Sequence, residues 1–195
     1  MGLSIISFIS DFGDLAVLLP MAAAIQIWLL RAPEARRPAF IWAISLLFCC
    51  GATGLSKIYF SACPFGGINS PSGHAALSVF VYCGFAAILG ARARRVLKFV
   101  LAAAGAGVAV AILVTRVILG AHSIIEVLIG SAIGIMALAP FAETVIRHPV
   151  LSPTKSLVIV IILIVLVLHH KDVQVEGLLR ILGAYLHSFS GNICL

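Results

Sequence analysis

Two short segments of this sequence hold residue types that can bind an anion and move a proton. In the first, Pro71 stands where a helix is expected to begin, with Ser70 as the expected N-cap. Ser72, Gly73 and His74 would then meet the positive end of the helix dipole and its unpaired N–H groups, which together favour anions. Gly73 lets an oxyanion approach the backbone closely. The imidazole of His74 can donate a proton beside it.

The second segment holds Arg116, His122 and Glu126. An arginine in so apolar a stretch is costly and is therefore a candidate functional residue. If His122 opens a helix, the i, i+4 spacing puts Glu126 on the same face, one turn deeper. The carboxylate would then accept the Nδ1 proton, fix the tautomer and leave Nε2 to attack an electrophile. A structural His–Glu pair with Arg116 as counter-ion is the alternative, and this segment alone leaves it open.

Other polar residues are weaker candidates. Lys57 ends the apolar run before the first segment, and a lysine at a helix end can simply extend its ammonium to water. A metal site is not predicted, because the five cysteines have no CxxC spacing. The histidines near the C-terminus also lack supporting carboxylates or cysteines; they are His169, His170 and His187.

The composition predicts what must position these residues. Hydrophobic residues make up 62% of the 195 residues and charged ones only 10%, more apolar surface than a soluble fold could cover. We therefore expect an all-α fold, a single integral membrane domain over residues 1–195 with about six transmembrane helices. The apolar runs near the length that crosses about 30 Å of hydrocarbon are 15–30, 40–56, 73–90, 96–119, 123–146 and the shorter 156–168.

The two ends of the chain are expected at the membrane surface or next to it. Residues 1–12 are apolar but broken by serines, so they either lie in the interface or extend the first helix. Residues 169–195 alternate apolar and polar positions in a way that suits a helix on the membrane surface.

The basic residues predict the orientation. Arginines and lysines gather in alternate connections, at residues 31–37, 92–98 and 147–155. Lysine and arginine enrichment marks the cytoplasmic side, so the net charge of +6 is read as a topology signal and not as a nucleic-acid site. Both chemical segments, a tight turn near Gly120 and both termini then fall on the opposite, extracytoplasmic face.

The two segments together resemble a known signature. Pro71-Ser72-Gly73-His74 followed by Arg116, five residues, His122, three residues and Glu126 is similar to the motifs of the type 2 phosphatidic acid phosphatase (PAP2) superfamily of membrane lipid phosphatases. The resemblance covers about residues 57–126 and implies the core that this superfamily shares with vanadium haloperoxidases.

The resemblance also implies roles. His122 would be the nucleophile that forms a phosphohistidine, Glu126 its orienting partner, and His74 the acid for the leaving group and then the base for water. The groups expected to hold the phosphoryl oxygens are Lys57, Ser72, the Gly73 backbone and Arg116. No metal and no other cofactor is expected, because these cations and a helix end already supply positive charge.

Three departures from the family pattern are visible. The family's first motif is a lysine, six residues and Arg-Pro, whereas here five residues separate Lys57 from Cys63-Pro64. Glu126 stands where aspartate is usual and keeps the acceptor with a longer reach. Two clear spans, instead of three, precede the Pro71 segment.

The expected function is that of a phosphatase that removes a terminal phosphate from a membrane lipid, in a bacterial cytoplasmic membrane with the site on the outer face. The substrate candidates are undecaprenyl diphosphate, phosphatidylglycerol phosphate, phosphatidate and a lipid A phosphate, and the sequence does not choose among them. A lipid phosphotransferase of the same fold and a lipid-phosphate binder or transporter without turnover are the alternatives. The sequence does not predict an oligomeric state.

Overall fold

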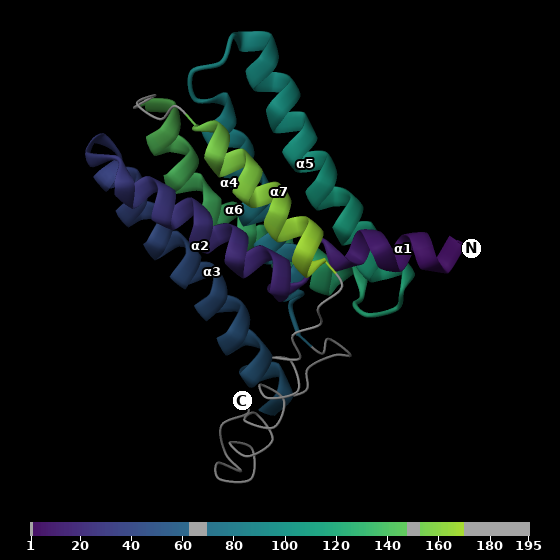
Figure 1. The fold of residues 1–195 in the computed structure, drawn as a ribbon. Helices are drawn as coiled ribbons and strands as arrows, with labels where there is room; N and C mark the ends of the chain where they lie inside the picture. The colour runs from purple at the N-terminus through teal and green to yellow at the C-terminus, as the bar shows by residue number, and fades with distance from the viewer. Residues whose placement is uncertain (1, 63–69, 148–152, 170–195) are drawn as a thin grey trace.

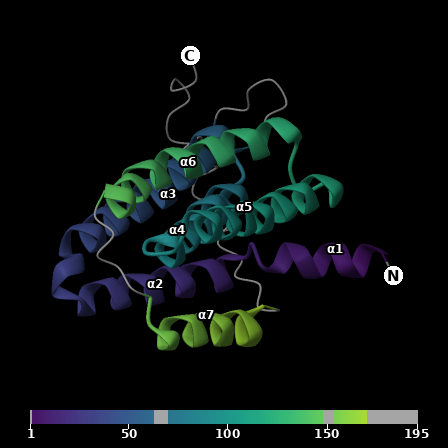
Figure 2. The same cartoon turned by 90° about the horizontal axis from the view of Figure 1, so that it is seen from above.

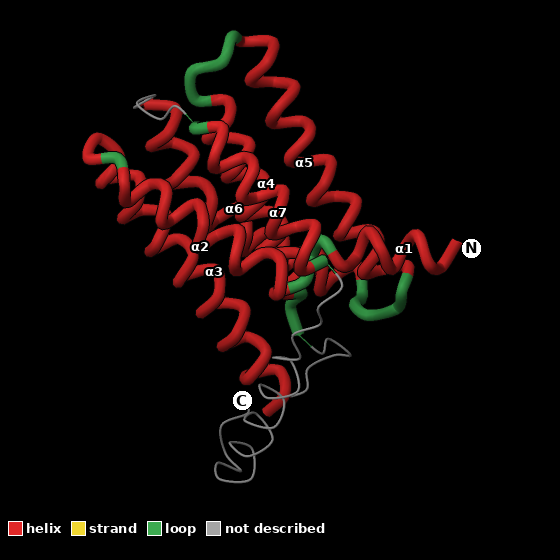
Figure 3. Tube along the Cα trace, in the orientation of Figure 1, coloured by secondary structure: helices red, strands yellow, loops and turns green. Residues whose placement is uncertain are grey.

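The computed structural model describes residues 2–62, 70–147 and 153–169 (Figure 1). Over these residues the chain is helical and contains no strand (Figure 3). The helices are α1 (Gly2–Asp11), α2 (Leu15–Arg31), the 3₁₀ turn η1 (Pro33–Ala35), α3 (Arg36–Ala62), α4 (Gly73–Gly90), α5 (Arg95–Ile118), α6 (Ile124–Arg147) and α7 (Lys155–Leu168). The predicted all-α helix bundle is confirmed.

The described helices have the lengths of an integral membrane protein. Five stretches are long and apolar enough to span a bilayer: Ile5–Arg31, Pro33–Phe60, Gly73–Gly90, Arg95–Ile118 and Ile124–Arg147. Two of them precede α4, as expected. Helix α7 has 14 residues, about 21 Å at 1.5 Å per residue. It is therefore shorter than the hydrocarbon core, and the crossing by the sixth expected span stays a prediction.

Helix α3 is longer than the sequence suggested. It covers 27 residues from Arg36 to Ala62 instead of 40–56, so Lys57 lies inside the helix and does not end it. The apolar run stops at Ser56, but none of the residues from Lys57 to Ala62 is a helix breaker, and Pro64 is the first proline that follows. The hydropathy pattern marks the lipid-facing part of a helix and not its end.

Helices α1 and α2 meet at a sharp junction, Phe12 to Asp14. Tyr82 Oη donates a hydrogen bond to the Phe12 carbonyl at 2.7 Å. Gly13 packs so tightly that a Cβ there would lie 2.5 Å from Ile112 Cγ2 and 3.3 Å from Ser78 Oγ. A side chain at Gly13 would force these neighbours apart, so the junction lies directly on α4 and α5. Gly2–Asp11 form a separate helix, followed by a turn.

Helix α4 is the most enclosed of the spans. Buried residues make up 61% of its apolar window, against 11% for α5. Around it, Trp42 stacks on Phe80 with ring centroids 4.5 Å apart and meets Phe141 edge-on at 4.7 Å. The Trp42 indole N–H donates to the Ala22 carbonyl at 3.1 Å, so its polar atom is satisfied. The middle of α4 is thereby held among α2, α3 and α6.

The connections sort to two ends of the bundle. In Figure 1 the α2–α3 and α4–α5 connections, the end of α6 and the start of α7, which carry the clustered basic residues, lie toward the upper end. The start of α2, the start of α4 and the α5–α6 turn lie at the lower end, where α1 leads away from the bundle. Figure 2 shows α7 against α2, on the opposite side of the bundle from α6.

Candidate active site

The N-terminus of α4 is capped by its own motif. Ser72 is the N-cap, not Ser70 as the sequence suggested: its hydroxyl accepts from the Ala75 N–H at 3.3 Å. Pro71 consequently lies just before the cap. The first-turn N–H groups that follow point out of the helix end, where an anion can meet them. The predicted helix start is therefore present, two residues later than expected, and it is suited to an anion.

Helix α6 approaches this N-terminus through glycines. A Cβ on Gly130 would collide with the Ser72 carbonyl oxygen, and one on Gly134 with the Ala76 carbonyl oxygen. The Ser72 N–H in turn donates to the Glu126 carbonyl at 3.0 Å. The close approach joins the two sequence segments, because the backbone of the first hydrogen-bonds the backbone of the second.

His122 and Glu126 form a buried pair at the start of α6. Their Nδ1 and Oε2 atoms are 3.0 Å apart, and the side chains are only 5% and 3% exposed. Because a carboxylate accepts, Nδ1 carries the proton and Nε2 carries the lone pair. The predicted contact between His122 and Glu126 is thus found, but His122 does not open the helix as the sequence suggested: α6 begins at Ile124, and His122 lies just before it.

The Glu126 carboxylate is fixed by backbone groups as well. Oε2 accepts from the Ser123 N–H at 2.9 Å, while the Ser123 hydroxyl accepts from the Glu126 N–H at 3.3 Å. This reciprocal pattern is a capping box. Oε1 accepts from the Ser70 N–H at 3.3 Å. The Glu126 carboxylate therefore hydrogen-bonds the His122 imidazole, the start of α6 and the segment before α4.

The turn between α5 and α6 sets the distance from Arg116 to His122. Gly120 has φ +66°, a conformation that favours glycine. The N–H groups of Ala121 and His122 both donate to the Arg116 carbonyl, at 3.1 and 3.3 Å. The turn expected near Gly120 folds His122 back onto the end of α5, so the backbones of Arg116 and His122 are in contact.

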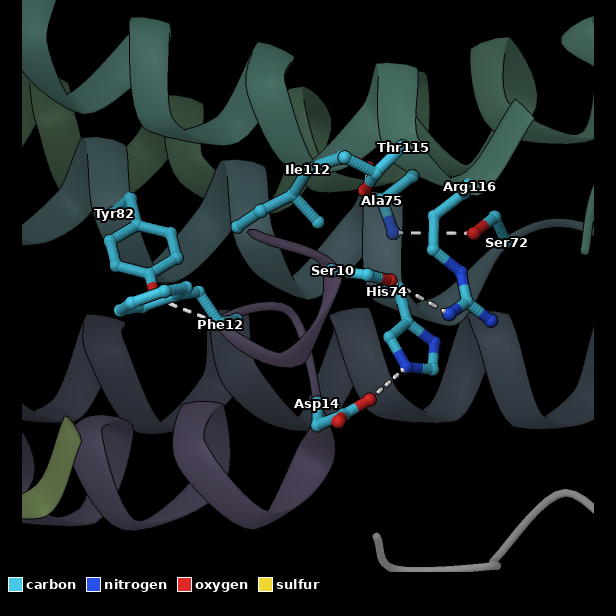
Figure 4. A network of polar contacts seen from close by, with 10 residues as sticks. All are labelled: Ser10, Phe12, Asp14, Ser72, His74, Ala75, Tyr82, Ile112, Thr115 and Arg116. Carbon is cyan, nitrogen blue, oxygen red and sulfur yellow. Dashed lines mark hydrogen bonds and ion pairs between the residues drawn. The ribbon is translucent and has the colours of Figure 1, made fainter. Parts of the chain in front are cut away.

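The Arg116 side chain is held from the N-terminal segment. Its Nη1 donates to Ser10 Oγ at 3.1 Å (Figure 4). Nε is buried and has no hydrogen-bond partner among the described residues. Arg116 as a whole is half-buried, and a guanidinium with an unused donor is suited to bind an anion.

His74 has a partner that the sequence analysis missed. Asp14 Oδ1 lies 2.7 Å from His74 Nε2 (Figure 4). Neither Asp14 nor Ser10 was a candidate, because both contacts bridge more than 50 residues of sequence. The local signal at Asp14 was misleading too, since an aspartate just before an apolar helix is normally read as its N-cap.

Of the remaining residues that the sequence singled out, the structure describes Lys57 and His169. Lys57 is buried at 9% exposed. Its Cε lies 3.7 Å from the position of a Cβ on Gly73, so this lysine reaches the start of α4 although it stands within α3. Cys63 lies outside the described residues, as do His170 and His187 and the C-terminal stretch expected on the membrane surface. His169 packs edge-on against Phe8, with centroids 4.3 Å apart.

Within the described ranges, no three histidine, cysteine, aspartate or glutamate side chains come together as a metal site would require. What gathers instead is two cationic side chains, Lys57 and Arg116, and two imidazoles, His74 and His122. The contacts join the seven predicted site residues in one region, where Lys57, Arg116 and the start of α4 can attract an oxyanion. The carboxylates of Glu126 and Asp14 each contact an imidazole, an arrangement suited to nucleophilic and acid–base chemistry.

Comparison with known proteins gives two matches. The family model described as the PAP2 superfamily matches residues 37–148. A protein of Klebsiella pneumoniae described as "Uncharacterized 22.5 kDa protein in cps region" is 36% identical over 149 residues, which cover 72% of this chain and 69% of that protein. No solved structure matches the chain.

Proposed function

The chain belongs to the PAP2 superfamily and has a phosphatase-type fold, and we propose on that premise that it is a membrane lipid phosphatase that hydrolyses a terminal phosphomonoester or diphosphate. The observation that carries the proposal is the hydrogen bond from the Ser72 N–H to the Glu126 carbonyl at 3.0 Å. It links a helix N-terminus suited to phosphate with a buried His–Glu pair suited to attack on phosphorus.

In the proposed reaction the phosphoryl oxygens bind Lys57, Arg116 and the start of α4 at Ser72 and Gly73. His122 Nε2 attacks phosphorus, and the P–O bond to the lipid breaks. His74 gives the leaving oxygen its proton. The positive groups stabilise the charge that the equatorial oxygens carry in the transition state, which is the main contribution that a protein makes to phosphoryl transfer.

The second step releases phosphate. His74, now neutral, takes a proton from water, the resulting hydroxide attacks the phosphohistidine, and the P–N bond breaks. Inorganic phosphate leaves, and the two histidines return to their first state. Glu126 stays ionised throughout and stabilises the positive imidazole of His122 as it forms.

We also propose the location. The chain would lie in a bacterial cytoplasmic membrane with the site on the extracytoplasmic face. Two observations support this: the helix ends that carry the clustered basic residues lie at the opposite end of the bundle from the α5–α6 turn, which contains His122 (Figure 1), and the matched relative is bacterial.

A panel of purified lipid phosphates in detergent tests the proposal. We expect phosphate release from at least one diphosphate or monoester lipid, and label from [³²P]lipid trapped on the protein in an acid-labile, base-stable form. His122→Ala should lose both, by at least about 10⁴-fold in kcat. Retained activity in His122→Ala contradicts the mechanism. Transfer of the label to a second lipid, without free phosphate, would instead identify a phosphotransferase.

A further inference from the structure

The contact between Asp14 and His74 is the feature that the motifs do not explain. The two side chains are only 14% and 16% exposed, and their atoms lie 2.7 Å apart across 60 residues of sequence. Asp14 occupies the N-cap position of α2, yet its side chain caps nothing. The carboxylate turns toward the imidazole instead (Figure 4). A residue that gives up a stabilising cap for a distant partner suggests that the partner matters.

The backbone around Asp14 is fixed. Its carbonyl accepts from the Val17 and Leu18 N–H groups at 3.0 and 2.9 Å, and its own N–H donates to the Asp11 carbonyl at 3.1 Å. Two residues earlier, the Phe12 carbonyl is bonded to Tyr82 on α4, the same helix that carries His74. The carboxylate is therefore held in place before any substrate binds, as an orienting group must be.

The geometry also decides which nitrogen can react. Nε2 faces the carboxylate, and a carboxylate accepts, so Nε2 carries a proton. Among the described residues Nδ1 of His74 has no hydrogen-bond partner. Nδ1 is the nitrogen left to exchange a proton with substrate and water.

We propose that Asp14 is a positioning residue for His74, supplied by a segment outside the family match at 37–148, and that it holds the Nε2–H tautomer so that Nδ1 transfers the proton. This inference rests on the proposed phosphatase function. In the first step the Nδ1 proton moves to the leaving oxygen while Nε2–H stays on Asp14. In the second step Nδ1 takes the proton of the attacking water, so protons balance over the cycle.

Leaving-group dependence tests the role in the holoprotein. An alkyl lipid alcohol needs a proton to leave, whereas p-nitrophenolate does not. We expect Asp14→Asn to lower kcat with phosphatidate by about 10- to 100-fold, a part of the 10²–10⁴ that general acid–base catalysis supplies. With p-nitrophenyl phosphate the rate of the first burst of p-nitrophenolate should stay within about 3-fold of the wild-type rate. Steady turnover after the burst should be slow, because the attack of water still needs His74.

Controls separate this role from a structural one. Asp14→Glu should recover part of the lost kcat, and Glu143→Gln, which removes a charge from the exposed pair with Arg147, should match the wild type. Equal loss of burst and lipid turnover in Asp14→Asn would overturn the proposal. Higher activity would overturn it too, because Asp14 would then be blocking the site.

A second readout does not depend on turnover. In ¹⁵N-histidine-labelled protein, at a pH high enough that the imidazole is neutral, the signals of His74, assigned by their absence in His74→Gln, should show the Nε2–H tautomer and lose it in Asp14→Asn. An unchanged tautomer contradicts the role of Asp14 whether or not the protein hydrolyses lipid phosphates. Loss of activity in His122→Ala reports on the proposed function alone, so the two failures are distinguishable.

Discussion

The two histidines of the site are held in different ways. His122 is oriented by Glu126 four residues away, within a capping box and with side chains 5% and 3% exposed. His74 is oriented by Asp14 from 60 residues away, in a contact that is 16% and 14% exposed. The support of the proposed nucleophile is local and buried, whereas that of the proposed acid comes from the junction between α1 and α2. Such a division suits a nucleophile that must stay fixed and an acid that must meet leaving group and water.

Glu126→Gln gives the largest expected effect on this comparison. The amide can donate to Nδ1, which would place the proton on the wrong nitrogen of His122, and we expect kcat to fall by roughly 10³-fold or more. Steady-state phosphate release measures it. Glu126→Asp, which keeps the carboxylate, should lose far less. If Asp14→Asn costs as much as Glu126→Gln, the two supports are equivalent and the contrast between them is wrong.

Gly130→Ala tests the close contact between α6 and the start of α4. The added Cβ meets the Ser72 carbonyl, so α6 must move away from α4. We expect a free energy of unfolding lower by about 1–3 kcal/mol and kcat lower by about 10- to 100-fold, because small misplacements of catalytic groups are costly. Thermal unfolding and phosphate release check this. Gly107→Ala, where nothing lies within 4 Å of an added Cβ, is the matched control. It should keep the wild-type kcat and be no less stable than the wild type.

Ser10→Ala tests the contact between Ser10 and Arg116, for which we expect the smallest effect. It removes the acceptor for Arg116 Nη1 at 3.1 Å. We expect KM to rise by about 3- to 10-fold with kcat nearly unchanged, as the loss of one ordinary hydrogen bond, worth about 1 kcal/mol, implies. Initial rates over a range of lipid concentrations measure both. Thr144→Ala loses a hydroxyl bonded only within its own helix and should leave KM as it was. A fall in kcat with constant KM would mean that Ser10 acts on chemistry and not on binding.

The same division explains what the sequence could predict. The spacing of His122 and Glu126 and the Pro71–His74 motif encode their geometry locally, so the pair and the anion-binding end were predictable. The contacts of Asp14 and Ser10 were not predictable, because no sequence pattern near either residue indicates a partner on α4 or α5. The composition predicted the all-helical membrane fold. It did not predict the end of α3, because hydropathy indicates lipid contact whereas a helix ends at a breaker or a cap.

The site's position within the chain has a consequence for how the protein is made. Asp14 leaves the ribosome 60 residues before its partner His74, and Ser10 precedes Arg116 by 106. The first helices must therefore enter the membrane with these polar groups unmatched, and the site is complete only when α6 has followed. Hydrolytic activity would thus require that every helix from α1 to α6 is in place, and an activity assay would also report on correct membrane insertion.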